Sequence, residues 1–195
     1  MKIGILSLQG DFEAHGHVLR CLGAKPVNIR HVKQLASIRG LILPGGESTT
    51  MLKLLEREKF IAPLIKFSEQ SPILGTCAGA ILMAKKVSSP KQQSLGMIDM
   101  TIERNAYGRH IDSSIQSINP EEKFVLQTAP GPIEAIFIRA PKIKHIGKKV
   151  VVLAAYENTP VLVEQNHFIA ATFHPELTNE QRVHALFLDR VCLTP

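Results

Sequence analysis

Tryptophan is absent from this chain of 195 residues, and aromatic residues make up only 5% of it. Proteins that bind single-stranded nucleic acid use aromatic side chains as stacking platforms for the bases. The net charge of +6 therefore does not by itself indicate a nucleic-acid partner, and none is expected. The basic segment 142–149 is interpreted as a solvated face, with docking to an acidic protein as the second interpretation.

The chain also lacks a long apolar run, and its three cysteines cannot all pair with one another. A helix that spans a bilayer needs about 20 apolar residues, so no membrane partner is expected. Residues 1–8 form a short apolar segment without the small-residue cleavage site of a signal peptide. We therefore expect a cytoplasmic protein, because free thiols persist in a reducing compartment.

Motifs for cofactors are scarce as well. The sequence has neither a phosphate-binding loop nor a dinucleotide fingerprint, so no organic cofactor is expected. His15, His17 and His31 could suggest a metal site, but no acidic or cysteine ligand has convincing spacing, and surface or core histidines are the favoured interpretation. Cys21 and Cys192 fall in expected helices and are interpreted as packing residues.

What the first half does contain is an alternation of strand and helix patterns. Apolar strands are predicted at 3–8, 26–30, 40–44 and 72–75, and helices at 12–22, 48–55 and 60–69. Such alternation predicts an α/β fold of three layers, in which helices flank a mostly parallel, flavodoxin-like sheet. Ligands of such sheets bind outside the carboxyl ends of the strands.

The second half is richer in strands, predicted at 95–102, 133–138, 150–155, 161–164 and 168–173. Several of these are expected to form an antiparallel extension of the sheet. A last helix is predicted to begin near Thr178 to Gln181, where the residues resemble a capping box, and to pack back on the sheet. Length and the absence of a linker predict one domain over 1–195.

The strongest local signal is Gly75-Thr76-Cys77-Ala78-Gly79, between a buried strand and the helix-forming run 80–86. It is a cysteine version of the nucleophile elbow, in which small neighbours permit a sharp turn from strand to helix. The turn would expose the sulfur at the edge of the sheet, where the helix amino terminus stabilises a thiolate. A buried structural cysteine is the alternative.

His174-Pro175-Glu176 follows the last predicted strand. In an extended segment, residues two apart point to the same side, so Glu176 could hydrogen-bond to His174 and orient it. His174 would then accept the proton of Cys77 and later protonate a leaving group. Taken alone, the tripeptide is equally compatible with a surface turn.

Gly45-Gly46-Glu47-Ser48-Thr49-Thr50 also follows a strand. Paired glycines let backbone amides approach a substrate closely. The amides of Gly46 and Ala78 are candidates for an oxyanion hole, in which one donor is typically worth about 2.7 to 4 kcal/mol of barrier. A helix cap near Ser48 is the simpler interpretation of the same residues.

Together these three motifs resemble the class I, triad-type glutamine amidotransferases. Further stretches at 8–10, 103–109, 137–141 and 173–178 are similar to the glutaminase subunits of pyridoxal 5'-phosphate synthase across nearly the whole chain. The resemblance implies hydrolysis of L-glutamine by Cys77, His174 and Glu176. It implies that the partner is a (β/α)8-barrel synthase subunit in a large hetero-oligomer. Contacts to glutamine are implied for Gly46, Glu47, Ser48, Arg104, Ile138 and Arg139.

Two alternatives are weighed against this hypothesis. The first is a glutaminase of another synthase or a γ-glutamyl hydrolase, which the stretches 104–109 and 137–141 disfavour. The second is a non-enzymatic redox sensor on the same type of fold. A sensor needs a thiolate but no oriented base, so Glu176 beside His174 favours the enzyme. The segment 113–116 departs from the family's more aromatic and acidic pattern and leaves the triad untouched.

Overall fold

The computed structural model describes residues 1–104 and 113–194. The helices are α1 (Phe12–Cys21), α2 (Ser48–Arg57), α3 (Ile61–Ser68), α4 (Ala78–Met83), α5 (Glu122–Val125) and α6 (Arg182–Leu193), with 3₁₀ turns η1 (Val32–Ser37) and η2 (Pro175–Leu177). The strands are β1 (Lys2–Leu6), β2 (Lys25–Ile29), β3 (Gly40–Leu43), β4 (Ile73–Thr76), β5 (Ala84–Ser88), β6 (Ile98–Glu103), β7 (Ser113–Ile118), β8 (Ile133–Ile138), β9 (Lys142–Ile146), β10 (Val151–Tyr156), β11 (Thr159–Gln165) and β12 (Phe168–Ala171).

The central sheet has the strand order β10-β11-β12-β4-β3-β1-β2. Strands β2, β1, β3, β4 and β12 are parallel, whereas β10 and β11 pair antiparallel with each other and β11 pairs antiparallel with β12. The parallel part is built from apolar strands such as β3 and β4, whose residues are all buried. The predicted parallel sheet with an antiparallel extension is confirmed.

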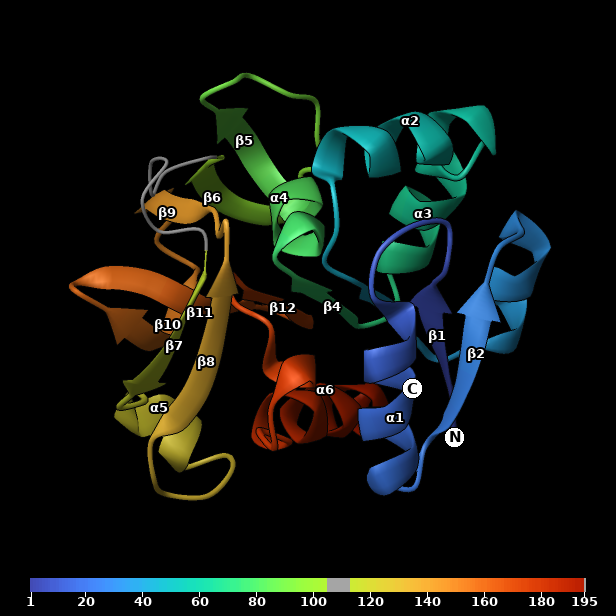
Figure 1. Cartoon of the computed structure of the whole chain (residues 1–195). Coiled ribbons are helices and arrows are strands. Elements are labelled where there is room, and N and C mark those ends of the chain that lie inside the picture. The colour runs from blue at the N-terminus through green and yellow to red at the C-terminus, as the bar shows by residue number, and fades with distance from the viewer. Residues whose placement is uncertain (105–112, 195) are drawn as a thin grey trace.

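Helices cover both faces of this sheet (Figure 1). One core cluster joins α1 and α6 to the sheet and to β8, with Leu19, Leu186 and Phe137 among its members. The other joins α2, α3 and α4 to the opposite face and to the small sheet β5-β6-β9, with Met51 and Leu82 among its members. The inner parallel strands β1, β3, β4 and β12 thus have no solvated face, which explains their apolar sequences, whereas the edge strand β2 exposes Lys25 and Asn28.

The helix expected through Lys86 is wrong at its carboxyl end. Helix α4 stops at Met83, and Ala84 already has an extended backbone. The next residues form β5, which pairs with β6 and buries Val87 while Lys85 and Lys86 stay exposed. Helical propensity is a weak preference, and pairing with β6 overrides it here.

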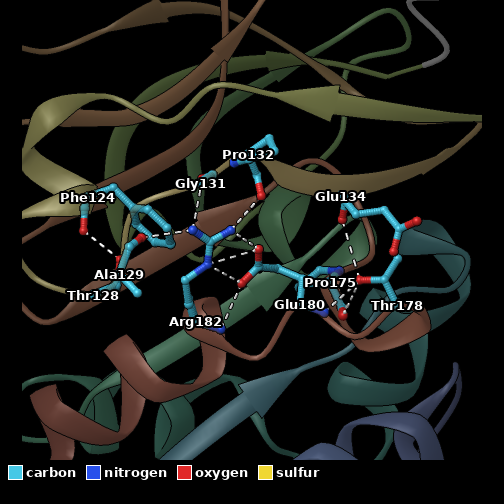
Figure 2. A network of polar contacts seen from close by, with 10 residues as sticks. All are labelled: Phe124, Thr128, Ala129, Gly131, Pro132, Glu134, Pro175, Thr178, Glu180 and Arg182. Carbon is cyan, nitrogen blue, oxygen red and sulfur yellow. Dashed lines mark hydrogen bonds and ion pairs between the residues drawn. The ribbon is translucent and has the colours of Figure 1, made fainter.

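The last helix also begins later than expected, at Arg182 and not near Thr178. The Thr178 hydroxyl accepts a hydrogen bond from Glu180 N–H at 3.0 Å, and the Glu180 carboxylate accepts one from Arg182 N–H at 2.8 Å. These bonds form a turn ahead of the helix. The Arg182 guanidinium pairs with Glu180 and donates to the carbonyls of Ala129, Gly131 and Pro132, which ties α6 to the loop before β8 (Figure 2).

Three strands were not predicted: β5, β7 and β9. Strand β9 lies within the basic segment 142–149, where Ile143 is buried against β6 while Lys144, His145, Lys148 and Lys149 are exposed. The predicted solvated face is confirmed for those four side chains. At the two edges of the central sheet, β2 carries Pro26, and β10 is bridged at Ala154 by Pro120.

Candidate active site

Cys77 sits in the sharp turn between β4 and α4, at the carboxyl edge of the sheet. Its N–H donates to Ala171 C=O at 2.9 Å, and its own C=O accepts the first helical hydrogen bond from Ile81 N–H at 3.2 Å. The backbone of Cys77 has φ 48° and ψ −103°, a conformation that costs a non-glycine residue about 1 to 3 kcal/mol. Such strain is typical of a nucleophile held in place by its surroundings.

Close packing of the elbow explains its small residues. A Cβ added at Gly79 would lie 2.0 Å from the C=O oxygen of Leu43, so only glycine fits where α4 crosses β3. The sulfur is less exposed than expected, because Cys77 is only 7% accessible. Helix α4 is also only six residues long. Its dipole is therefore a weaker source of thiolate stabilisation than the predicted longer helix would be.

His174 and Glu176 lie next to Cys77, just after β12. His174 Nδ1 and Glu176 Oε1 are 2.7 Å apart, and both side chains are buried. The expected extended tripeptide is wrong, because Glu176 lies in the 3₁₀ turn η2, but the turn still brings the two side chains together. His174 N–H donates to Ile136 C=O at 2.8 Å, which anchors the segment to β8.

The electrostatics favour a charged His174. Burial alone would lower the pKa of His174, but its hydrogen bonds to Cys77 and Glu176 outweigh burial and raise the pKa to about 10. Burial would raise the pKa of the Glu176 carboxyl, but the neighbouring His15 and His174 hold that pKa below its usual value. At neutral pH His174 is therefore an imidazolium, paired with the Glu176 carboxylate and beside Cys77 in the cleft.

The glycine-rich loop after β3 closes the site from the other side. A Cβ at Gly45 would lie 2.4 Å from Cε1 of His174, so the loop backbone packs directly on the imidazole. Gly46 has φ 144°, a conformation that glycine adopts readily. Gln9 Oε1 accepts a hydrogen bond from Glu47 N–H at 3.1 Å and so holds the loop against the end of β1.

The Glu47 side chain caps helix α2. Its carboxylate accepts hydrogen bonds from Thr49 N–H at 3.1 Å and Thr50 N–H at 2.7 Å, and pairs with Arg104 at 3.1 Å. Burial opposes the charge, but the hydrogen bonds from Thr50 and Thr49 together outweigh burial and lower the pKa of Glu47 to about 2. The helix cap considered for this segment is thus present, one residue before Ser48.

A cleft of about 430 Å³ opens over these groups, a size suited to a small-molecule ligand. It brings together Cys77 and His174 with all six residues expected to contact glutamine, namely Gly46, Glu47, Ser48, Arg104, Ile138 and Arg139. Glu176 lies behind His174, outside the lining. Ala78, whose N–H is at the first position of α4 and has no acceptor within its own helix, is 1% accessible.

The cleft also contains residues that the sequence did not single out as ligand contacts. They are Gln9, Asp11, Ile81, Pro141 and Leu177. Gln9, Pro141 and Leu177 lie within the family-like stretches 8–10, 137–141 and 173–178, which was the available signal for them. Asp11 and Ile81 each follow a predicted motif by only one or two positions. Residues 105–109 of the family-like stretch lie outside the described residues.

The other cysteines and the histidines considered for a metal site lie apart from the cleft lining. Cys21 and Cys192 are exposed, so their prediction as packing residues is wrong. His17 and His31 are exposed and His15 is fully buried, and no group of metal-ligating side chains occurs within 1–104 and 113–194. Across the same residues, none of the helices is both long enough and apolar enough to cross a membrane.

Solved structures define the class to which this fold belongs. A protein described as a glutamine amidotransferase superposes with a TM-score of 0.89 at 38% sequence identity, covering 98% of this chain and 99% of that one. PurLQS from Thermotoga maritima superposes with a TM-score of 0.72 at 16% identity, over 96% of this chain and 97% of that one, and so shares the fold. The fold is that of the glutamine amidotransferases.

Sequence comparison identifies the family. Residues 5–193 match the SNO glutamine amidotransferase family, and the chain belongs to it. Relatives described as pyridoxal 5'-phosphate synthase subunit PdxT include proteins from Solibacter usitatus, 56% identical over 97% of this chain and 99% of the relative, and Koribacter versatilis, 50% identical over 98% and 96%. Membership of an enzyme family favours the enzyme over the redox sensor.

Proposed function

We propose that this protein hydrolyses L-glutamine to L-glutamate and ammonia with Cys77, His174 and Glu176 as its triad. The observation that carries the proposal is the pairing of the carboxylate with the imidazole beside the sulfur. Glu176 Oε1 lies 2.7 Å from His174 Nδ1, and His174 lines the same cleft as Cys77, which also raises the pKa of His174. A nucleophile, a base and an orienting group in this order are the requirement for acyl transfer by covalent catalysis.

The reaction follows from the positions of these groups. The Cys77 thiolate attacks the side-chain amide carbon of glutamine, and the amide oxygen becomes an oxyanion. The amides of Gly46 and Ala78 are proposed to stabilise that charge. His174 donates its proton to the leaving nitrogen, so that ammonia departs and a thioester remains. His174 then takes a proton from water, whose oxygen attacks the thioester, and glutamate leaves as the proton returns to the Cys77–His174 pair.

Charged and polar groups around the cleft support recognition of an amino acid. Glutamine presents a carboxylate and an ammonium group besides its reacting amide. Arg104 and Arg139 line the cleft and suit the carboxylate, whereas Glu47 suits the ammonium group. Ser48 and the backbone at Ile138 offer further polar atoms beside the sulfur, since the Ile138 C=O lies 4.0 Å from Cys77 Sγ.

The ammonia is proposed to serve pyridoxal 5'-phosphate synthesis, the process named in the descriptions of the relatives. The proposed partner is the synthase subunit, a (β/α)8 barrel, in a large hetero-oligomer in the cytoplasm. The free thiols of Cys21 and Cys77 are compatible with a reducing compartment. No second function is favoured by an observation of its own.

The test is ammonia release from glutamine by the chain mixed with its synthase subunit. Cys77→Ala is expected to abolish release, because the methyl group cannot form the thioester. Cys21→Ala and Cys192→Ala are matched controls, since both remove an exposed thiol remote in sequence from the elbow, and both are expected to keep wild-type turnover. Wild-type release by Cys77→Ala would refute the assignment of the nucleophile.

A further inference from the structure

A row of buried polar side chains continues behind Glu176, away from the cleft. His15 Nε2, from α1, lies 3.5 Å from Glu176 Oε1 and 3.2 Å from the hydroxyl of Thr76. On the far side of the ring, His15 Nδ1 lies 2.9 Å from Nε2 of His184, which comes from α6. Both histidines are completely inaccessible to solvent. Figure 1 shows α1 and α6 side by side in front of the sheet, as this contact requires.

The tautomers follow from the neighbouring charges. A lone pair on His15 Nε2 would face the Glu176 carboxylate and repel it, so Nε2 carries the hydrogen. His15 Nδ1 is then the acceptor and His184 Nε2 the donor. His184 Nδ1 is left as a bare acceptor, and within the described residues it has no hydrogen-bond partner. The opposite arrangement would add a buried unpaired N–H to the repulsion at Glu176, so it is disfavoured.

We propose that His15, supported by His184, is a positioning residue that fixes the Glu176 carboxylate for its contact with His174. The proposal rests on the triad described under Proposed function. The oxygen that His15 approaches, Oε1, is the same atom that contacts His174, whereas Glu176 Oε2 has no hydrogen-bond partner among the described side chains and backbone. A carboxylate contacted on one oxygen by two rings from different elements cannot turn without losing both contacts.

The charge state suits a positioning role. Burial lowers the pKa of His15, and burial also lowers the pKa of His184 to about 3, so both rings are neutral when the enzyme works. A neutral N–H orients the carboxylate without cancelling its charge. A cationic His15 would instead compete with His174 for Glu176 and weaken the imidazolium that faces Cys77.

The acid side of the pH profile gives a readout specific to this role. The titratable groups around Glu176 are His174 from its own segment, His15 from α1 and His184 from α6, with Asp11 near His15 and Cys77 beyond His174. The His15 N–H hydrogen-bonds to the Thr76 hydroxyl and lies 3.5 Å from Glu176 Oε1, so its removal takes away a dipole that stabilises the ionised carboxylate. Glu176 then gains its proton at a higher pH, so the acid limb of kcat moves upward in pH.

The experiment compares His15→Phe and His15→Gln in complex with the synthase subunit. His15→Phe keeps a ring but no donor and is expected to lower kcat roughly 10- to 100-fold, as for supporting residues of other sites, with little change in KM. Its acid limb should lie at higher pH than in the wild type. His15→Gln has an amide donor and should recover part of kcat and of the pH profile.

Leu19→Ala is the matched control, because Leu19 is a fully buried residue of the same helix that belongs to the apolar core. It is expected to lower the melting temperature without moving the pH profile of the folded fraction.

Wild-type kcat and pH profile in folded His15→Phe would overturn the proposal, as would a loss of kcat with an unshifted acid limb. If His15→Phe does not fold, His184→Phe carries the same test with a smaller expected shift. Ammonia release by Cys77→Ala in this assay would refute the triad itself, independently of His15.

Discussion

In the proposed triad, His174 is the residue on which the chemistry depends, because it pairs with Glu176 and lines the cleft beside Cys77. Its ring pairs with Glu176 on one side and packs against Gly45 on another. Its backbone N–H donates a hydrogen bond to Ile136 C=O in β8. A side chain fixed in this way needs little reorganisation during the reaction. Substitutions that remove the charge of His174 and substitutions that only disturb its orientation should therefore lower the rate of ammonia release by different amounts.

Substitutions in the triad should therefore be graded. His174→Asn removes the acid and base and is expected to be nearly as damaging as Cys77→Ala. Glu176→Gln disturbs orientation more than proton transfer and should cost roughly one to two orders of magnitude less, as the acidic member does in other triads. Steady-state ammonia release measures both. The effects of His174→Asn and Cys77→Ala should not multiply in the double variant, and multiplication would show that the two residues act independently.

The three buried histidines should differ sharply in a titration followed by NMR. His174 is expected to keep its proton to about pH 10, whereas the pKa of His15 should lie below 6.5 and that of His184 near 3. His174→Asn and His15→Phe would assign the signals. A signal of His174 that titrates near its ordinary value of 6.5 would contradict the imidazolium.

These shifts also predict how stability depends on pH. Because the unfolded chain binds protons at His15 and His184 that the folded chain does not, their contribution is lost as the pH falls below about 6.5. The contribution of His174 has the opposite sign, and is lost as the pH rises toward about 10.

At the scale of elements, the turns after β3, β4 and β12 carry the site. The sequence predicted these turns because each follows an apolar strand and each carries chemically distinctive residues, Gly46, Cys77 and His174. The role proposed for His15 could not be predicted, because the contact joins α1 to residues 61 and 169 positions away. Strand β5 was missed because its pairing with β6 is likewise a tertiary interaction, which local propensity does not encode.

Two glycines in helices should respond oppositely to alanine. At Gly16, within α1, a Cβ would meet nothing closer than 3.4 Å, the flexible end of Arg20. Gly16→Ala is therefore expected to raise stability by about 0.5 to 1 kcal/mol, because alanine loses less backbone entropy in a helix. Gly79→Ala would force the methyl group against Leu43 and should unfold or inactivate the protein. Thermal melting measures both, and a stabilised Gly79→Ala would contradict the proposed packing of the elbow.

The hydrogen bonds and ion pair of Arg182 join α6 to the loop that leads into β8. Arg182→Met leaves Glu180, whose side chain is only 4% accessible, without its partner and also removes the donors to three carbonyls. The expected loss is about 3 kcal/mol, the low end for a buried pair, since Arg182 is partly exposed. Urea unfolding measures it. The double variant Arg182→Met/Glu180→Gln should lose less, and an equal loss would locate the effect in the carbonyl contacts.

At the scale of the whole molecule, the two core clusters lie on opposite faces of one sheet. We propose that residues 1–195 accordingly form one domain. The cleft opens at one edge of that sheet, so a partner that docks there would cover Gln9 and the loop 45–50 together.

We expect the isolated chain to be a poor glutaminase that becomes competent on docking. An enzyme that released ammonia without an acceptor would waste glutamine, and Gly45-Gly46 can change the orientation of a single peptide. One misplaced oxyanion donor would raise the barrier by about 2.7 to 4 kcal/mol, or two to three orders of magnitude in rate. The comparison is ammonia release with and without saturating synthase subunit, with Cys77→Ala as the blank. Equal turnover in the two conditions would exclude activation by docking. The proposal that the chain is a glutaminase would be unaffected.

The edges of the central sheet have a consequence for the hetero-oligomer proposed above. An uncovered edge strand invites β-pairing with another molecule, and the proposed hetero-oligomer would bring copies of this chain close together. Pro26 interrupts the donors of β2, and Pro120 with Glu121 N–H occupies the outer side of β10. Both edges of the sheet are thereby less able to pair with another strand, so neighbouring copies in the proposed hetero-oligomer are expected to aggregate less readily through them.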